Sequence, residues 1–120
     1  MKILLADDDP SIIELLTEYL AMAGHAVSSA YDAKSLVSMI AADVPELVFC
    51  DINMPGIRDD DRTPKIEIPM ALKNIPVVAL TGNEYEKLLQ MGLPKDIQVL
   101  AKPIDFAEVD AVIAKYAKPR

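Results

Sequence analysis

The chain has 120 residues, 52% of them hydrophobic, which suits one domain with its own hydrophobic core. Nineteen acidic residues against twelve basic ones give a formal net charge of −7, which argues against direct binding to nucleic acid or an anionic membrane. The single cysteine excludes an internal disulfide, and no apolar run approaches the ~18 residues of a membrane span. These features predict one cytoplasmic domain over residues 1–120.

The first part of the chain alternates two apolar runs with two helical patterns. Residues 3–6 form a predicted buried strand that leads into three consecutive aspartates. Asp9, the last of these, is the expected cap of a helix that ends at Gly24. Residues 26–30 predict a second, weaker strand near a sheet edge, and Asp32 is the expected cap of a second helix.

The most informative stretch is 47–56, where four apolar residues lead directly into Asp51 and a Pro-Gly turn follows. A short continuous apolar run bounded by turn signals is typical of a strand covered on both faces, as in a parallel sheet. Ligands of such sheets gather at the carboxyl ends of the strands. The sequence therefore predicts that a buried strand delivers Asp51 to its exposed end.

Two further strands follow in the second part of the chain. Residues 75–80 predict a fourth strand that ends at Thr81, and residues 97–101 predict a fifth that ends at Lys102. Each is followed by a helical pattern with the spacing of a capping box at its start. The residues with this spacing are Asn83 with Glu86 and Asp105 with Glu108.

The alternation is interrupted in the slot of the third helix. Pro69 would remove a helical hydrogen bond and clash with the preceding turn, so no continuous helix can pass through it. The acidic run 59–61, flanked by two arginines, favours solvent. We therefore predict a partly mobile, partner-facing segment over 58–74, whose best helix is short, with Pro69 at its first position and 70–72 following.

Strands alternating with helices predict an α/β domain with an open parallel sheet and helices on both faces. The carboxyl ends of parallel strands meet at one edge of the sheet, so the polar residues that follow them should converge. Those residues are Asp7, Asp8, Asp51, Thr81 and Lys102.

This set predicts phosphoryl chemistry. Three close carboxylates repel one another unless a cation joins them, and an all-oxygen site with few carboxylates suits Mg²⁺. One carboxylate can then attack a phosphoryl group while donors stabilise the developing charge. The strand position selects Asp51 as nucleophile, which leaves Asp7 and Asp8 as metal ligands and Thr81 and Lys102 as donors.

Four segments, ILLADDDP, LVFCDINMPG, VVALTG and LAKP, occur in an order and at intervals that resemble the receiver domain of two-component response regulators. The resemblance covers essentially all 120 residues. It implies a flavodoxin-like five-stranded sheet of order 2-1-3-4-5 with an irregular or shortened third helix. It also implies a signalling domain that catalyses only its own phosphorylation and dephosphorylation, with a sensor histidine kinase or histidine phosphotransferase and a downstream effector as partners.

The resemblance also implies a set of metal ligands. Asp8 would hold Mg²⁺ together with Asp7, directly or through water. Asp51 and the backbone carbonyl of Asn53 would complete the protein ligands.

The resemblance implies roles for the phosphoryl group as well. Asp51 would be the phosphoacceptor, Thr81 and Lys102 would bind the phosphoryl group, and the Lys102–Pro103 peptide bond would be cis. The family usually has an aromatic residue three positions before the lysine, where this chain has Val99. We therefore expect the surface around 97–100 to change little on activation.

Two other functions stay open at this point. A degenerate receiver would bind partners without phosphorylation, and Val99 together with the irregular third segment is compatible with it. A haloacid-dehalogenase-type phosphohydrolase also uses a nucleophilic aspartate with Mg²⁺, threonine and lysine. That family needs a second aspartate two positions on, where this chain has Asn53, which cannot transfer protons. Nothing in the sequence specifies an oligomeric state.

Overall fold

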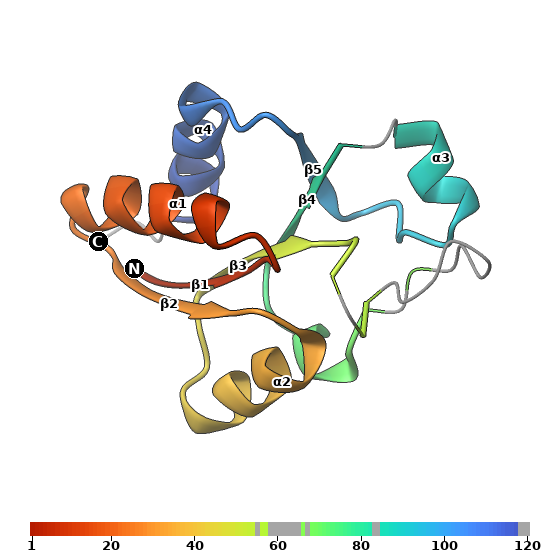
Figure 1. Cartoon of the computed structure of the whole chain (residues 1–120), viewed down its shortest axis with the longest axis horizontal. Helices are drawn as coiled ribbons and strands as arrows, with labels where there is room; N and C mark the ends of the chain where they lie inside the picture. The colour runs from red at the N-terminus through yellow and green to blue at the C-terminus, as the bar shows by residue number, and fades with distance from the viewer. Residues whose placement is uncertain (55, 58–65, 67, 83–84, 118–120) are drawn as a thin grey trace.

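The computed structural model describes residues 1–54, 56–57, 66, 68–82 and 85–117, with a five-stranded parallel sheet at its centre (Figure 1). The strands are β1 (Lys2–Ala6), β2 (Ala26–Ala30), β3 (Leu47–Asp51), β4 (Val77–Thr81) and β5 (Gln98–Ala101). Their order is β2-β1-β3-β4-β5, so the predicted α/β fold and strand order are confirmed.

Helices follow the strands as the alternating pattern predicted. They are α1 (Pro10–Met22), α2 (Ala33–Ala42), the 3₁₀ helix η1 (Met70–Leu72), α3 (Tyr85–Gln90) and α4 (Phe106–Tyr116). Asp9, Asp32 and Asp105 cap α1, α2 and α4, because each carboxylate accepts a backbone N–H of the first turn. Among the described residues, no helix is long and apolar enough to cross a membrane.

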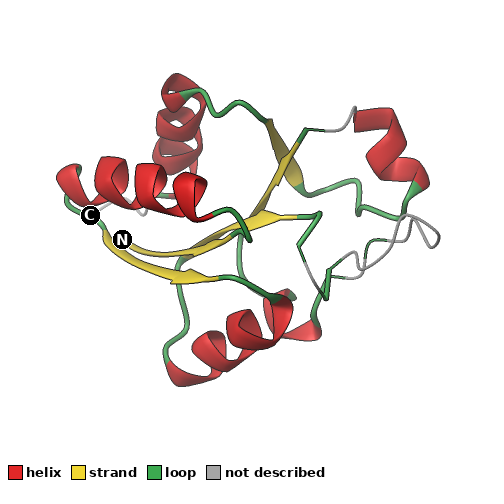
Figure 2. Cartoon of the chain, viewed as in Figure 1, coloured by secondary structure: helices red, strands yellow, loops and turns green. Residues whose placement is uncertain are grey.

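The helices cover the two faces of the sheet (Figure 2). The side chains packed between the helices and the sheet form two hydrophobic clusters. Because side chains alternate along a strand, each strand contributes to both clusters. Leu5, for example, packs beneath α1 and α4, whereas its neighbour Leu4 packs on the opposite side with α2, η1 and α3. All five residues of β3 are buried, as expected for the central strand.

An aromatic contact joins α1 and α4, the two helices that cover the same face of the sheet. The rings of Tyr19 in α1 and Phe106 in α4 are stacked with their centroids 4.0 Å apart. The Tyr19 hydroxyl also donates to the carboxylate of Asp110, 2.7 Å away. The start of α4 is thereby fixed to α1, close to the end of β5.

The third segment agrees with the sequence prediction where it is described. The short helix η1 begins just after Pro69, which precedes it as its cap rather than occupying its first position. Residues 58–65 and 67, on which the rest of that prediction falls, lie outside the described residues, as does Asn83. Strand β4 begins two residues later than predicted, because Pro76 has no N–H to donate to the ladder.

Candidate functional site

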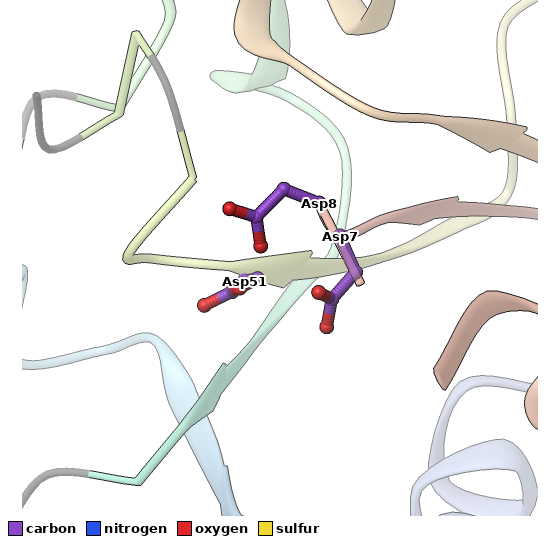
Figure 3. Close-up of side chains that lie close together, drawn as sticks. All are labelled: Asp7, Asp8 and Asp51. Atoms are coloured by element: carbon purple, nitrogen blue, oxygen red, sulfur yellow. The ribbon is translucent and has the colours of Figure 1, made fainter. Parts of the chain in front are cut away.

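Three carboxylates lie together at the carboxyl end of the sheet (Figure 3). Asp7 follows β1, Asp8 comes next, and Asp51 ends β3; one oxygen from each lies within 4.8 Å of the others. Asp7 and Asp51 are buried, whereas Asp8 is exposed. The arrangement follows from the parallel pairing of Ala6 with Cys50, which brings the next residue of each strand to the same level.

The Asp7 carboxylate is fixed on one side only. Its Oδ1 accepts the backbone N–H of Asp9 at 2.9 Å. The backbone N–H of Asp7 donates to the Ala30 carbonyl at 3.1 Å. Its Oδ2 is buried and has no hydrogen-bond partner of suitable geometry, although Lys102 Nζ lies 3.0 Å away. Among the described residues, the charge of this buried oxygen is therefore compensated by the Lys102 ammonium.

Asp51 is held in an environment that opposes its negative charge. Burial, with a smaller contribution from the neighbouring Asp7 carboxylate, raises the pKa of its carboxyl to about 6, against the lowering effects of the Asn53 backbone N–H and of Lys102. Its Oδ1 accepts the Asn53 N–H at 2.9 Å, and its Oδ2 lies 3.3 Å from Lys102 Nζ. The adjacent Cys50 thiol is buried and its pKa is raised to about 12, so it packs rather than reacts.

Lys102 reaches the carboxylates from the end of β5. Its backbone N–H donates to the Thr81 carbonyl at 2.8 Å, which fixes the chain after β5 beside the end of β4. Burial alone would lower the pKa of its ammonium, but the Asp7 and Asp51 carboxylates outweigh burial and raise it. The Lys102–Pro103 peptide bond is cis, as the family resemblance implied.

The structure brings Asp7, Asp8, Asp51 and Lys102 together, and it places Thr81 at the end of β4, the strand next to β3. Thr81 is fully buried at the end of β4, one position beyond Leu80, the residue paired with Asp51. Two features escaped the sequence reasoning. One is the hydrogen bond from the Asn53 backbone N–H to the Asp51 carboxylate. It forms a turn that the Asp-x-Asn spacing could have suggested. The other is the ion pair between Lys102 and Asp7, which depends on how two distant strands are placed.

The donor set fits a small divalent cation. Carboxylate oxygens are the ligands that Mg²⁺ prefers, and the exposed Asp8 leaves one side open to water molecules, which Mg²⁺ usually retains. Asp7 Oδ2 is consistent with this fit, because its charge is compensated by the Lys102 ammonium and a bound cation could compensate it in the same way. When bound, the metal would neutralise the carboxylates and bind phosphoryl oxygens.

Comparison with known proteins gives the class of this fold and site. The family model described as "Response regulator receiver domain" matches residues 3–114. A protein of Leptolyngbya boryana, described as a 14.6 kDa protein in the sodA1 3′ region, is 30% identical over 118 residues, covering 97% of this chain and 89% of the relative. The chain belongs to the receiver domain family of response regulators.

Two larger proteins contain a similar domain. The response regulator PleD of Caulobacter vibrioides is 30% identical over 105 residues, covering 87% of this chain and 23% of PleD. The crystal structure of NtrX from Brucella abortus has a TM-score of 0.72 and 28% identity, covering 95% of this chain and 26% of that one. This chain thus spans about a quarter of the length of PleD and of NtrX.

Family membership narrows the functions that the sequence left open. The chain is a signalling receiver domain, a class that is switched by phosphorylation and is generally not one of metabolic enzymes. The family match and the sheet order give no support to a phosphohydrolase of the haloacid-dehalogenase type.

Proposed function

We propose that Asp51 of this receiver domain accepts a phosphoryl group in a reaction that requires Mg²⁺. The donor is the phosphohistidine of a cytoplasmic sensor histidine kinase or histidine phosphotransferase, and the modified domain changes its binding to a downstream effector. The observation that carries this proposal is the convergence of Asp7, Asp8, Asp51 and Lys102 at one edge of the sheet.

The transfer is a displacement at phosphorus. An oxygen of the ionised Asp51 carboxylate forms a new P–O bond while the P–N bond of the phosphohistidine breaks, and the bonding electron pair returns to the imidazole nitrogen. With a pKa of about 6, the carboxylate is mostly ionised at neutral pH and therefore able to attack. Its hydrogen bond from the Asn53 amide orients one oxygen and leaves the other on the side of Lys102.

The remaining residues have separate roles. Asp7 and Asp8 would hold Mg²⁺ with Asp51 and the Asn53 carbonyl, since one carboxylate oxygen from each aspartate lies within 4.8 Å of the others. The Lys102 ammonium, now 3.3 Å from Asp51 Oδ2, would pair with the phosphoryl oxygens. The Thr81 hydroxyl would supply a further hydrogen bond.

The proposal is tested by labelling with a small phosphodonor such as acetyl phosphate, followed by mass spectrometry of the intact protein. Wild type should gain one phosphoryl group with Mg²⁺ and none with a chelator, and Asp51→Asn should gain none. Asp43→Asn, which changes an exposed aspartate at the other end of the sheet, is the matched control and should label normally. Undiminished labelling of Asp51→Asn would refute the assignment.

Two further variants separate metal binding from phosphoryl recognition. Asp8→Ala should weaken Mg²⁺ binding strongly. Thr81→Ala should leave Mg²⁺ binding intact but weaken the spectral response to beryllofluoride, a mimic of the phosphoryl group. A folded wild-type protein that neither labels nor responds to beryllofluoride would instead favour a receiver that works without phosphorylation.

A further inference from the structure

The turn after β3 passes unusually close to the start of α2. Gly56 in this turn has φ +89°, a backbone conformation that residues with a side chain rarely adopt. A Cβ placed on Gly56 would lie 2.5 Å from the Cβ of Ala33, the first residue of α2. Two carbon atoms cannot approach so closely, so any side chain at position 56 would push the turn and the helix apart.

The other glycines show that this contact is specific to one place. Gly24 has φ +93° with nothing within 4 Å of the Cβ position. Gly92 has φ +97° and meets a backbone oxygen, that of Ile66, at an ordinary 3.7 Å. Gly24 and Gly92 therefore share the backbone requirement of Gly56 without its crowding.

The helix side of the contact is well anchored. The Asp32 carboxylate accepts the Ser35 N–H at 2.7 Å and the Ser35 hydroxyl at 2.6 Å, which caps the first turn of α2. Leu36, in the same turn, is completely buried in the core. A displacement at Gly56 would therefore be taken up mainly by the turn and less by α2.

The turn side leads directly to the candidate site. Met54 and Ile57 are buried, and the Ile57 N–H donates to the Met54 carbonyl at 3.0 Å. Asn53, just before them, carries both the N–H that donates to Asp51 and the carbonyl assigned above to the metal. Two residues along the chain thus separate Gly56, which contacts Ala33, from Asn53 of the site.

We propose that the contact between Ala33 and Gly56 positions the turn after β3, so that both residues act as positioning residues for the metal and phosphoryl site. The close approach places the turn against a fixed helix end and thereby sets where the Asn53 amide and carbonyl lie relative to Asp51. The expected effect on metal and phosphoryl binding rests on the proposed function, whereas the close approach of Gly56 to Ala33 does not.

The test compares Gly56→Ala with Gly24→Ala, because both place a side chain at a positive φ and only the first creates a clash. In the metal-free protein, hydrogen exchange of the Asn53 amide should accelerate about ten-fold in Gly56→Ala and be unchanged in Gly24→Ala. Mg²⁺ affinity, measured by calorimetry, should fall about ten-fold in Gly56→Ala alone, as when groups that orient metal ligands are altered.

Relieving the clash from the other side should restore the site. The double variant Ala33→Gly with Gly56→Ala removes the opposing Cβ while keeping the positive-φ strain, so both measurements should return towards wild type. If Gly56→Ala does not fold, Ala33→Val crowds the same contact without backbone strain and should give the same two changes.

The two proposals fail in different ways. If wild type binds no Mg²⁺, the proposed function fails, while Asn53 exchange still decides whether the contact positions the turn. If Gly56→Ala matches Gly24→Ala in Asn53 exchange and in affinity, or if the double variant recovers neither, the positioning role is wrong even when wild type is phosphorylated normally.

Discussion

The two ends of the sheet each carry a lysine paired with carboxylates, and the pairs differ mainly in burial. At the amino end, Lys2 Nζ lies 2.9 Å from Asp43 Oδ1, with 56% and 68% of the two side chains exposed. At the carboxyl end, Lys102 Nζ lies 3.0 Å from Asp7 and 3.3 Å from Asp51, whose side chains are 1% and 3% exposed.

The comparison shows what burial does to the same chemistry. Water screens the exposed pair at the amino end, so it fastens β1 only weakly to the residue after α2. At the carboxyl end, both buried carboxylates depend on Lys102 for compensation, and the compensation is incomplete because one ammonium is shared between two negative charges. A bound cation would therefore relieve uncompensated charge at the carboxyl end of the sheet, whereas the exposed Lys2–Asp43 pair at the amino end has no such charge to relieve.

The largest effect is expected when Lys102 is removed. Lys102→Met leaves two buried carboxylates facing each other, and should lower the unfolding free energy by about 2 kcal/mol at pH 8 without metal, less than for a fully buried pair because part of Lys102 is exposed. Urea denaturation in the presence of a chelator measures this. The deficit should shrink when Mg²⁺ is added or at pH 5, where Asp51 can bind a proton; an unchanged stability would contradict the comparison.

Asp51→Asn should raise the unfolding free energy, whereas Lys102→Met lowers it. Because the folded protein raises the pKa of Asp51 to about 6, the ionised carboxylate is disfavoured in the fold, and wild type loses stability as pH rises through the range from about 4 to 6. Asparagine lacks this loss, so the metal-free variant should be more stable by about 1–2 kcal/mol above pH 6, after allowing for solvent screening.

The pH profile is the check on Asp51→Asn. Its advantage in urea denaturation should be complete above pH 6 and disappear as the pH falls towards 4, since the wild-type carboxyl is then protonated as well. A constant advantage at every pH would show that packing, and not charge, is responsible.

Lys2→Met should change stability by less than about 0.5 kcal/mol, because both partners are mostly exposed. The same urea denaturation series, run beside Lys102→Met, gives the contrast between the two ends directly. A loss at the amino end as large as that at the carboxyl end would show that burial is not what separates the two pairs.

The smallest effect concerns Val99 in β5, which is only partly buried and lies where the family usually has an aromatic residue. A valine lacks the bulk and the polar group of an aromatic residue such as tyrosine, so we expect it to respond little to a change at the phosphoryl site. Amide chemical-shift changes with beryllofluoride should therefore be smaller over 97–100 than at Gly82. Shift changes over 97–100 as large as those at Gly82 would contradict this prediction, because they would show that β5 responds to the phosphoryl mimic.

Much of the fold could be predicted because its determinants are local. The apolar run ending at Asp51, and the caps Asp9, Asp32 and Asp105, specify strand ends and helix starts from a few neighbouring residues. The convergence of polar residues followed from topology, since parallel strands place their carboxyl ends together.

What the sequence could not supply are contacts between distant segments. The Lys102 ion pair with Asp7 depends on how β5 and β1 are placed across β3 and β4. The approach of Gly56 to Ala33 depends on the angle at which the turn leaves β3, and the glycine alone signals only a turn. Such distances are fixed by packing over the whole domain.

The stack of Tyr19 on Phe106 gives this protein a built-in optical reporter. The chain has no tryptophan, so its near-ultraviolet signal comes mainly from four tyrosines. Tyr19 differs from an ordinary surface tyrosine, because its ring is stacked and its hydroxyl donates to Asp110, which raises the pKa of the phenol. Its circular dichroism and its alkaline ionisation should therefore follow the docking of α4 on α1 without any added label.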